Sequence, residues 1–152
     1  MKKSFKRKIG KRGPVVAKKV SYDSIDFASG LEKHMYIALK EAGIESEYEG
    51  KTFVLHDGFY FDNQVYERQS NGKGDYINRG EKKILSIKYT PDFIGKNFII
   101  ETKGRANESF PMRWKLFKKL VSCQLPGYTI YKPQNQAECQ ETVRLILLKQ
   151  KS

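Results

Sequence analysis

The sequence is poor in the residues and segments that mark secreted or membrane proteins. It has only two cysteines, Cys123 and Cys139, and their separation fits neither a zinc-binding motif nor a disulfide framework. No apolar run approaches the roughly 20 residues that a membrane-spanning helix needs. The charged first residues, Met-Lys-Lys-Ser-Phe-Lys-Arg-Lys, have no apolar segment behind them, so they do not form a secretory signal. We therefore expect a soluble protein of the reducing cytoplasm, without a membrane partner.

Acidic residues are missing altogether from residues 1–20, which hold nine lysines and arginines. The rest of the chain carries only +3 of the net charge of +12. Such cationic blocks are usually flexible and bind polyanions by releasing condensed counterions. We expect a flexible basic arm over 1–20 and a single folded domain over 21–152; an arm that only increases solubility is the alternative. The residues of the arm expected to contact DNA are Lys2, Lys3, Lys6, Arg7, Lys8, Lys11, Arg12, Lys18 and Lys19.

Apolar periodicity and turn residues predict an alternation of helices and strands after the basic arm. Residues 56–82 are the hardest to interpret, with a possible strand near 59–66 and then a polar loop from Ser70 to Lys83. The succession of elements favours an α/β domain with helices packed on a central sheet. The predicted helices cover residues 29–42, 112–123 and 136–149, and the predicted strands cover 46–55, 84–89, 98–103 and 128–132.

Two carboxylates and a lysine are predicted to meet at the end of strand 98–103. Alternate residues of a strand share a face, so Glu101 and Lys103 emerge together. Asp92 ends the preceding strand and can come alongside Glu101 through a tight turn. One or two carboxylates, water and a substrate phosphate are the usual ligands of Mg²⁺. The spacing alone leaves open an ordinary ion pair at an exposed strand end.

The literal sequence around these residues resembles the signature of the PD-(D/E)xK nuclease superfamily. The segments Tyr-Thr-Pro-Asp-Phe (89–93) and Ile-Ile-Glu-Thr-Lys-Gly (99–104) carry that resemblance. Together with Phe-Ala-Ser-Gly-Leu-Glu (27–32), Gly43-Ile44 and Glu-Tyr-Glu (47–49), they resemble more closely the phage endonuclease I family of Holliday-junction resolvases. The resemblance implies a restriction-endonuclease-like α/β fold, with a mixed central β-sheet flanked by α-helices.

The same resemblance implies roles for five residues. Asp92 and Glu101 fall on metal-binding carboxylates, Thr102 on a ligand through its backbone carbonyl, and Lys103 on the catalytic lysine. Glu32 falls on a helical catalytic glutamate that helps to hold a second metal ion or the attacking water. The implied cofactor is Mg²⁺ or Mn²⁺, and the implied assembly is a homodimer that cuts branched DNA during recombination. If the protein is phage-encoded, it acts in the cytoplasm of the host cell.

Basic residues after the Glu-x-Lys motif are further candidates for DNA contact. Arg105 follows the motif directly, and Arg113 and Lys115 lie on the basic face of the predicted helix 112–123, for which a merely solvated surface is the alternative. We therefore expect a metal-dependent, structure-selective DNA endonuclease. A nuclease of the same superfamily with restriction-like or repair specificity is the first alternative. A non-catalytic nucleic-acid-binding protein is the second.

Overall fold

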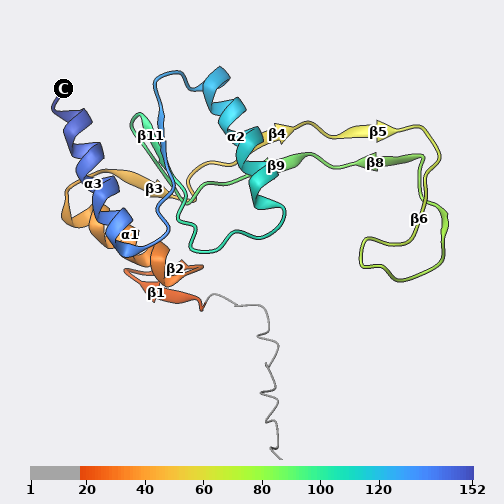
Figure 1. The fold of residues 1–152 in the computed structure, drawn as a ribbon, viewed down its shortest axis with the longest axis horizontal. Coiled ribbons are helices and arrows are strands. Elements are labelled where there is room, and N and C mark those ends of the chain that lie inside the picture. Colours follow the sequence, from red (N-terminus) through yellow and green to blue (C-terminus); the bar gives the residue numbers. More distant parts are fainter. Residues whose placement is uncertain (1–17) are drawn as a thin grey trace, which may run out of the picture.

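The computed structural model describes residues 18–152, which form a mixed α/β fold around a four-stranded sheet (Figure 1). Strand β11 pairs in parallel with β12, whereas β10 pairs antiparallel with both β11 and β3. The expected mixed central sheet flanked by helices is confirmed. In sheet order, its strands are β12 (Thr129–Tyr131), β11 (Phe98–Ile100), β10 (Phe93–Gly95) and β3 (Ser46–Tyr48).

Helices cover both faces of this sheet because the side chains of β11 alternate between two apolar clusters. Phe98 and Ile100 pack in one cluster with residues of α1 (Gly30–Glu41) and α3 (Gln136–Gln150). Ile99, which is fully buried, packs in the other cluster with residues of α2 (Phe110–Gln124). The apolar run before Glu101 is therefore buried on both sides. None of the helices described within residues 18–152 is long and apolar enough to cross a membrane.

Helix α1 begins and ends at the residues that the sequence indicates. Ser29 is its N-cap, and the side chain of Ser29 accepts a hydrogen bond from the backbone of Glu32. Gly43 follows the helix with φ +67°, the left-handed conformation in which a glycine ends a helix without steric cost. Helices α2 and α3 also lie within two residues of their predicted limits.

A short hairpin precedes α1 and joins the helix to the core. It consists of β1 (Val20–Tyr22) and β2 (Ile25–Phe27). The ring of Phe27 is fully buried, with its centroid 4.8 Å from that of Tyr48 on β3. Of the basic arm, Lys18 and Lys19 are exposed, and the expectations for Lys2 to Arg12 lie outside the described residues.

Residues 53–89 form a two-stranded antiparallel ribbon that projects from the domain, called here the β-ribbon (Figure 1). The predicted strand 46–55 is wrong as one element, because Glu49 with φ +48° separates β3 from the ribbon. The predicted loop from Ser70 to Lys83 contains β7 and most of β8. The pairs of the ribbon are β4 (Phe53–His56) with β9 (Ile87–Tyr89), β5 (Phe59–Phe61) with β8 (Lys82–Ile84), and β6 (Tyr66–Glu67) with β7 (Ile77–Asn78).

The strand predicted at 84–89 therefore does not lie beside β11, and Asp92 does not end it. Strand β9 leaves the β-ribbon, and the chain then begins the separate strand β10 directly after Asp92. Phe93 is fully buried, and its packing in the core holds β10 in the central sheet. The tight turn at 95–97 connects β10 with β11, as the sequence indicates.

Candidate active site

The register of the β10–β11 hairpin brings Asp92 and Glu101 together. Phe93 pairs with Ile100. Asp92, which directly precedes β10, therefore lies opposite Glu101, which directly follows β11. Both side chains line a pocket of about 240 Å³, to which the start of α1 contributes Glu32 and the end of the β-ribbon contributes Tyr89. The expected meeting of the carboxylates is thus present, although Asp92 reaches it from the start of a strand.

Asp92 is held by the residue between the two charged positions of the Glu-x-Lys motif. Its Oδ2 accepts hydrogen bonds from the backbone amide and from the hydroxyl of Thr102, each 2.6 Å long. Burial, and next the nearby charge of Glu101, raise the pKa of Asp92 to about 7. Thr102 therefore fixes the carboxylate in place; its expected role as a ligand through the backbone carbonyl stays a prediction.

Glu101 is only 5% exposed and is incompletely paired. Its Oε1 lies 3.6 Å from Nζ of Lys103. Its buried Oε2 and the buried hydroxyl of Tyr89 beside it both lack a partner with good hydrogen-bond geometry among residues 18–152. Burial raises the pKa of Glu101 even though Tyr89 and Lys103 act in the opposite direction. An ionised, buried carboxylate without full compensation is costly, and a cation would remove that cost.

Lys103 stands at the rim of the pocket and extends the β11 ladder beyond its last strand residue. The backbone amides of Glu101 and Lys103 donate to the carbonyls of Tyr131 and Pro133, so both residues keep the strand alternation. The side chain of Lys103 is 29% exposed, and Nζ lies 4.8 Å from the centre of the Phe110 ring. Its ammonium group therefore lies between the Glu101 carboxylate and the solvent, where it can contact a molecule that enters the pocket.

Glu32 lines the same pocket, but its carboxylate is already bound within the protein. One oxygen accepts from the Ser29 hydroxyl, and the other accepts from the Ala28 amide and the Tyr48 hydroxyl, the last at 2.6 Å. Ser29 and Glu32 occupy the positions of a capping box, but the carboxylate accepts from the amide of Ala28, one residue before the N-cap, and so stabilises the start of α1. Within residues 18–152, no three His, Cys, Asp or Glu side chains lie close enough to form a metal-binding group, so Glu32 does not complete one with the carboxylate pair.

Three pocket contacts were not expected from the sequence. Tyr48 binds Glu32; Tyr89 presents a buried hydroxyl beside Glu101; and Arg113 lines the pocket instead of lying only on a solvated face. The guanidinium of Arg113 donates to the backbone carbonyl of Lys88, and its Nε is buried without a partner among the described residues. Each contact joins segments far apart in the sequence, so no local pattern indicates it.

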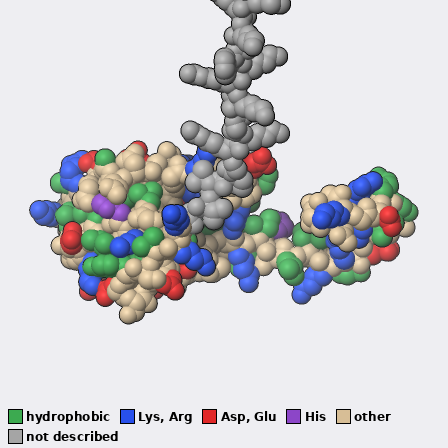
Figure 2. Space-filling model, turned by 90° about the horizontal axis from the view of Figure 1, so that it is seen from below, with side chains coloured by type: hydrophobic (Ala, Val, Ile, Leu, Met, Phe, Trp, Pro, Cys, Tyr) green, Lys and Arg blue, Asp and Glu red, His purple; other side chains and the backbone are tan. Residues whose placement is uncertain are grey.

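The remaining basic candidates lie outside the pocket. Arg105 and Lys115 are exposed, and neither lines it. Lysine and arginine side chains are also visible on the surfaces of both the domain and the β-ribbon (Figure 2). The structure thus leaves these residues free to face a large anionic partner without placing them at the carboxylates.

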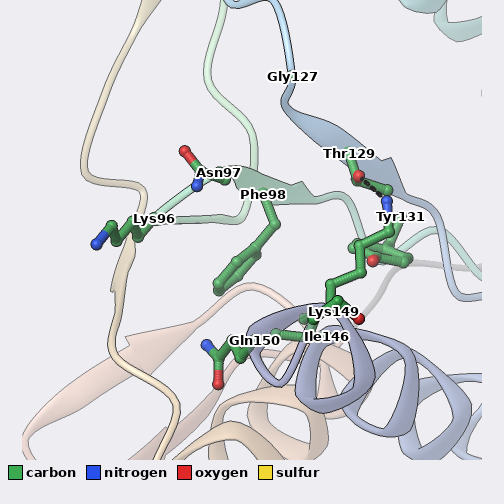
Figure 3. Close-up of a pocket in the computed structure, with 10 residues that line it drawn as sticks. Lys96, Asn97, Phe98, Gly127, Thr129, Tyr131, Ile146, Lys149 and Gln150 are labelled. Atoms are coloured by element: carbon green, nitrogen blue, oxygen red, sulfur yellow. Dashed lines mark hydrogen bonds between the residues drawn. The ribbon is translucent and has the colours of Figure 1, made fainter.

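A larger pocket of about 480 Å³ opens at the opposite end of the central sheet (Figure 3). It lies between the β11–β12 edge and the end of α3, where Phe98 faces Ile146 and where Lys149 donates to the hydroxyl of Thr129. The described residues that line it include no acid, histidine or cysteine. The carboxylate pocket is therefore the better candidate for an active site, although it is smaller.

Comparison with known proteins identifies one family. A model of that family, described as a protein of unknown function (DUF1064), matches residues 12–132. No curated protein and no solved structure matches the chain. The match includes Glu32, Asp92, Glu101, Lys103 and the whole β-ribbon, and the chain therefore belongs to the DUF1064 family.

Proposed function

We propose that this protein is a divalent-metal-dependent DNA endonuclease that hydrolyses phosphodiester bonds. The observation that carries the proposal is the buried pair of Asp92 and Glu101, with an unpartnered carboxylate oxygen and with Lys103 3.6 Å from the other oxygen. Hard oxygen ligands of this kind suit Mg²⁺ or Mn²⁺. The resemblance to the PD-(D/E)xK signature supports the same assignment independently of the geometry.

The side chains of the pocket have distinct roles in this proposal. Asp92 and Glu101 would hold the ion, which when bound would neutralise the buried carboxylates and stabilise negative charge that develops on a phosphate. Lys103, at the rim, would donate a hydrogen bond to the phosphate or orient the attacking water. Thr102 keeps Asp92 in position, and Glu32 with its three hydrogen bonds would act on the far side of the pocket as an assisting carboxylate.

The substrate class follows from charge and resemblance together. A net charge of +12 favours a polyanion, and the basic arm over 1–20 would add affinity that falls steeply with salt. The resemblance to junction resolvases points to branched DNA, to a homodimer that cuts paired strands, to a role in recombination, and to action in the cytoplasm. Arg105 and Lys115 would contact the DNA outside the pocket, and Arg113 would contact it at the pocket wall.

Cleavage of an end-labelled four-way junction and of the matching linear duplex tests the proposal. Each substrate is incubated with Mg²⁺ or with EDTA, using the wild type, Glu101→Gln and Lys103→Ala. Lys96→Ala is the matched control, because Lys96 is exposed at the opposite end of the sheet. We expect paired nicks in the junction that require Mg²⁺, are lost in the two pocket variants and persist in the control.

The other outcomes separate the alternatives. Equal cutting of the duplex would keep the nuclease and remove the preference for branched DNA. Tight binding without cleavage under either Mg²⁺ or Mn²⁺ would overturn the enzymatic proposal and leave a nucleic-acid-binding protein. Cleavage that persists in Glu101→Gln and Lys103→Ala would place the chemistry elsewhere.

A further inference from the structure

The β-ribbon exposes an unusual number of aromatic rings. Tyr60 is 61% exposed, Tyr66 55% and Tyr76 68%, and Phe59 is also exposed. Rings contribute most to stability when they are buried, so several exposed rings on one projecting element indicate a surface that another molecule covers. Of the residues of the β-ribbon, only Phe53 and Tyr89, at its base, are among the buried residues of the two core clusters.

Contacts within the β-ribbon hold several of these rings in place while leaving them accessible. The hydroxyl of Tyr60 donates to the carbonyl of Glu81 on the opposite side of the ribbon, at 2.7 Å. Near the tip, the ring centroids of Tyr66 and Tyr76 lie 6.2 Å apart. The guanidinium of Arg79 donates to the carbonyls of Glu67 and Asp75, and so joins the two sides of the tip. The rings are therefore preorganised and lose little freedom on binding.

Lysines lie beside the rings in the register of the ladder. Tyr60 pairs with Lys83, so the exposed ring and this lysine share one face of the β-ribbon. Lys82 pairs with Phe61 on the other face, where its Nζ lies 3.8 Å from the Glu67 carboxylate. Directly opposite residues in a ladder are about 5 Å apart. A ring that can stack on a base thus has next to it a cation that can contact the adjoining phosphate. Rings and cations together form the usual surface for single-stranded nucleic acid.

The β-ribbon is continuous with the candidate active site. Its last strand residue, Tyr89, lines the carboxylate pocket, and Arg113 in the same pocket donates to the carbonyl of Lys88. A strand of nucleic acid that enters the pocket would therefore pass the base of the ribbon. Lysine is depleted at the centres of protein interfaces and, on an edge strand, discourages the addition of another strand. Lys82 and Lys83 on β8 thus argue against a second copy of the chain as the molecule that covers the rings.

We propose that the β-ribbon binds unpaired nucleotides of a DNA substrate, with bases stacking on Tyr60 and on the Tyr66–Tyr76 pair and with a phosphate contacting Lys83. The proposal rests on the proposed function for its choice of DNA, and it deepens that function by naming the feature of the substrate that is recognised. It assigns recognition to an element that lies outside the catalytic pocket.

The test measures the affinity of the full-length protein for a labelled oligothymidylate of about 20 nucleotides and for a blunt hairpin duplex. EDTA is present throughout, so the result does not depend on cleavage. The variant Tyr60→Leu/Tyr76→Leu removes two rings, whereas Tyr60→Phe/Tyr76→Phe keeps the rings and removes only the hydroxyls. Tyr22→Leu is the matched control, since Tyr22 is an exposed tyrosine on β1, outside the ribbon.

We expect the double leucine variant to bind oligothymidylate at least about tenfold more weakly, because stacking is worth roughly 1 to 3 kcal/mol per base. Tyr22→Leu should bind as the wild type does, and duplex binding should change little. The double phenylalanine variant should keep most of the affinity, because it retains both rings and loses only the contact of the Tyr60 hydroxyl with Glu81. Circular dichroism should give the same unfolding temperature for all variants, because the substituted side chains lie outside the two core clusters.

Unchanged oligothymidylate binding in the leucine variant would overturn the proposal, as would an equal loss in the phenylalanine variant. A leucine variant that binds normally but changes from dimer to monomer in sedimentation would show instead that the ribbon is a protein interface. The two proposals fail separately. Ring-dependent binding without cleavage in Mg²⁺ would remove only the nuclease, and Mg²⁺-dependent cleavage without ring dependence would remove only the role of the ribbon.

Discussion

Asp92 is expected to destabilise the metal-free protein at neutral and alkaline pH, and Asp92→Asn is expected to remove that effect. Burial and the charge of Glu101 raise the pKa of Asp92 from 3.8 to about 7. The folded state therefore binds this proton more tightly than the unfolded state does. The corresponding stability is fully present below about pH 4 and is lost as the pH rises to about 7.

The size of the effect follows from that shift. One unit of pKa corresponds to about 1.4 kcal/mol, so the full shift would give at most roughly 4 kcal/mol, and sharing of charge with Glu101 reduces this to roughly 2 to 4 kcal/mol. Asparagine has nearly the same shape as aspartate, and its carbonyl oxygen can still accept both hydrogen bonds from Thr102. The substitution thus removes the charge and keeps the packing.

Urea unfolding in EDTA at pH 4.5, 6 and 8 measures the effect. We expect the midpoint of Asp92→Asn to rise relative to that of the wild type by about 1 to 2 M between pH 4.5 and pH 8. Asp57→Asn, which replaces an exposed carboxylate on the β-ribbon, serves as the control and should follow the wild type. Parallel pH profiles for the wild type and Asp92→Asn would refute the argument, because they would mean that the buried pair carries no electrostatic cost.

Three further predictions concern the pocket and the core. Mg²⁺ at about 100 times its dissociation constant should stabilise the wild type by about 2.7 kcal/mol and should stabilise Glu101→Gln much less. Thermal unfolding with and without the ion measures this difference, and equal stabilisation of both proteins would mean that the ion binds elsewhere. Tyr48→Phe removes a donor to the buried Glu32 carboxylate and should lower the free energy of unfolding by about 1 to 3 kcal/mol, whereas Tyr128→Phe, outside this network, should have little effect. Phe117→Ala should leave a cavity between α2 and the sheet and cost about 3 to 5 kcal/mol in urea unfolding; a cost below about 1 kcal/mol would show that the cluster is loosely packed.

The candidate catalytic residues could be predicted because most of the information is local. Glu101 and Lys103 share a strand face by alternation alone, and a tight turn at 95–97 returns the chain far enough to place Asp92 opposite Glu101. The caps of α1 are equally local, since Ser29, Glu32 and Gly43 act within a few residues of the helix they delimit.

The strands around the β-ribbon could not be assigned from the same kind of pattern. Phe53 pairs with Tyr89, 36 positions later in the chain, and this pairing depends on the packing of both rings against Phe117. In the ribbon itself, the exposed rings give no alternation of buried and exposed residues by which a strand is recognised. The segment therefore has the composition of a surface loop although it is paired.

The sequence by itself determined the three helices, the mixed α/β class, and the meeting of Asp92, Glu101 and Lys103, because caps, periodicity and strand alternation act over a few residues. Only the tertiary structure decided that Asp92 directly precedes the separate strand β10, that Tyr48 binds Glu32, and that Arg113 joins the pocket to the β-ribbon. These contacts link segments whose separation in the chain is large, and they form only when both apolar clusters pack on the two faces of one sheet.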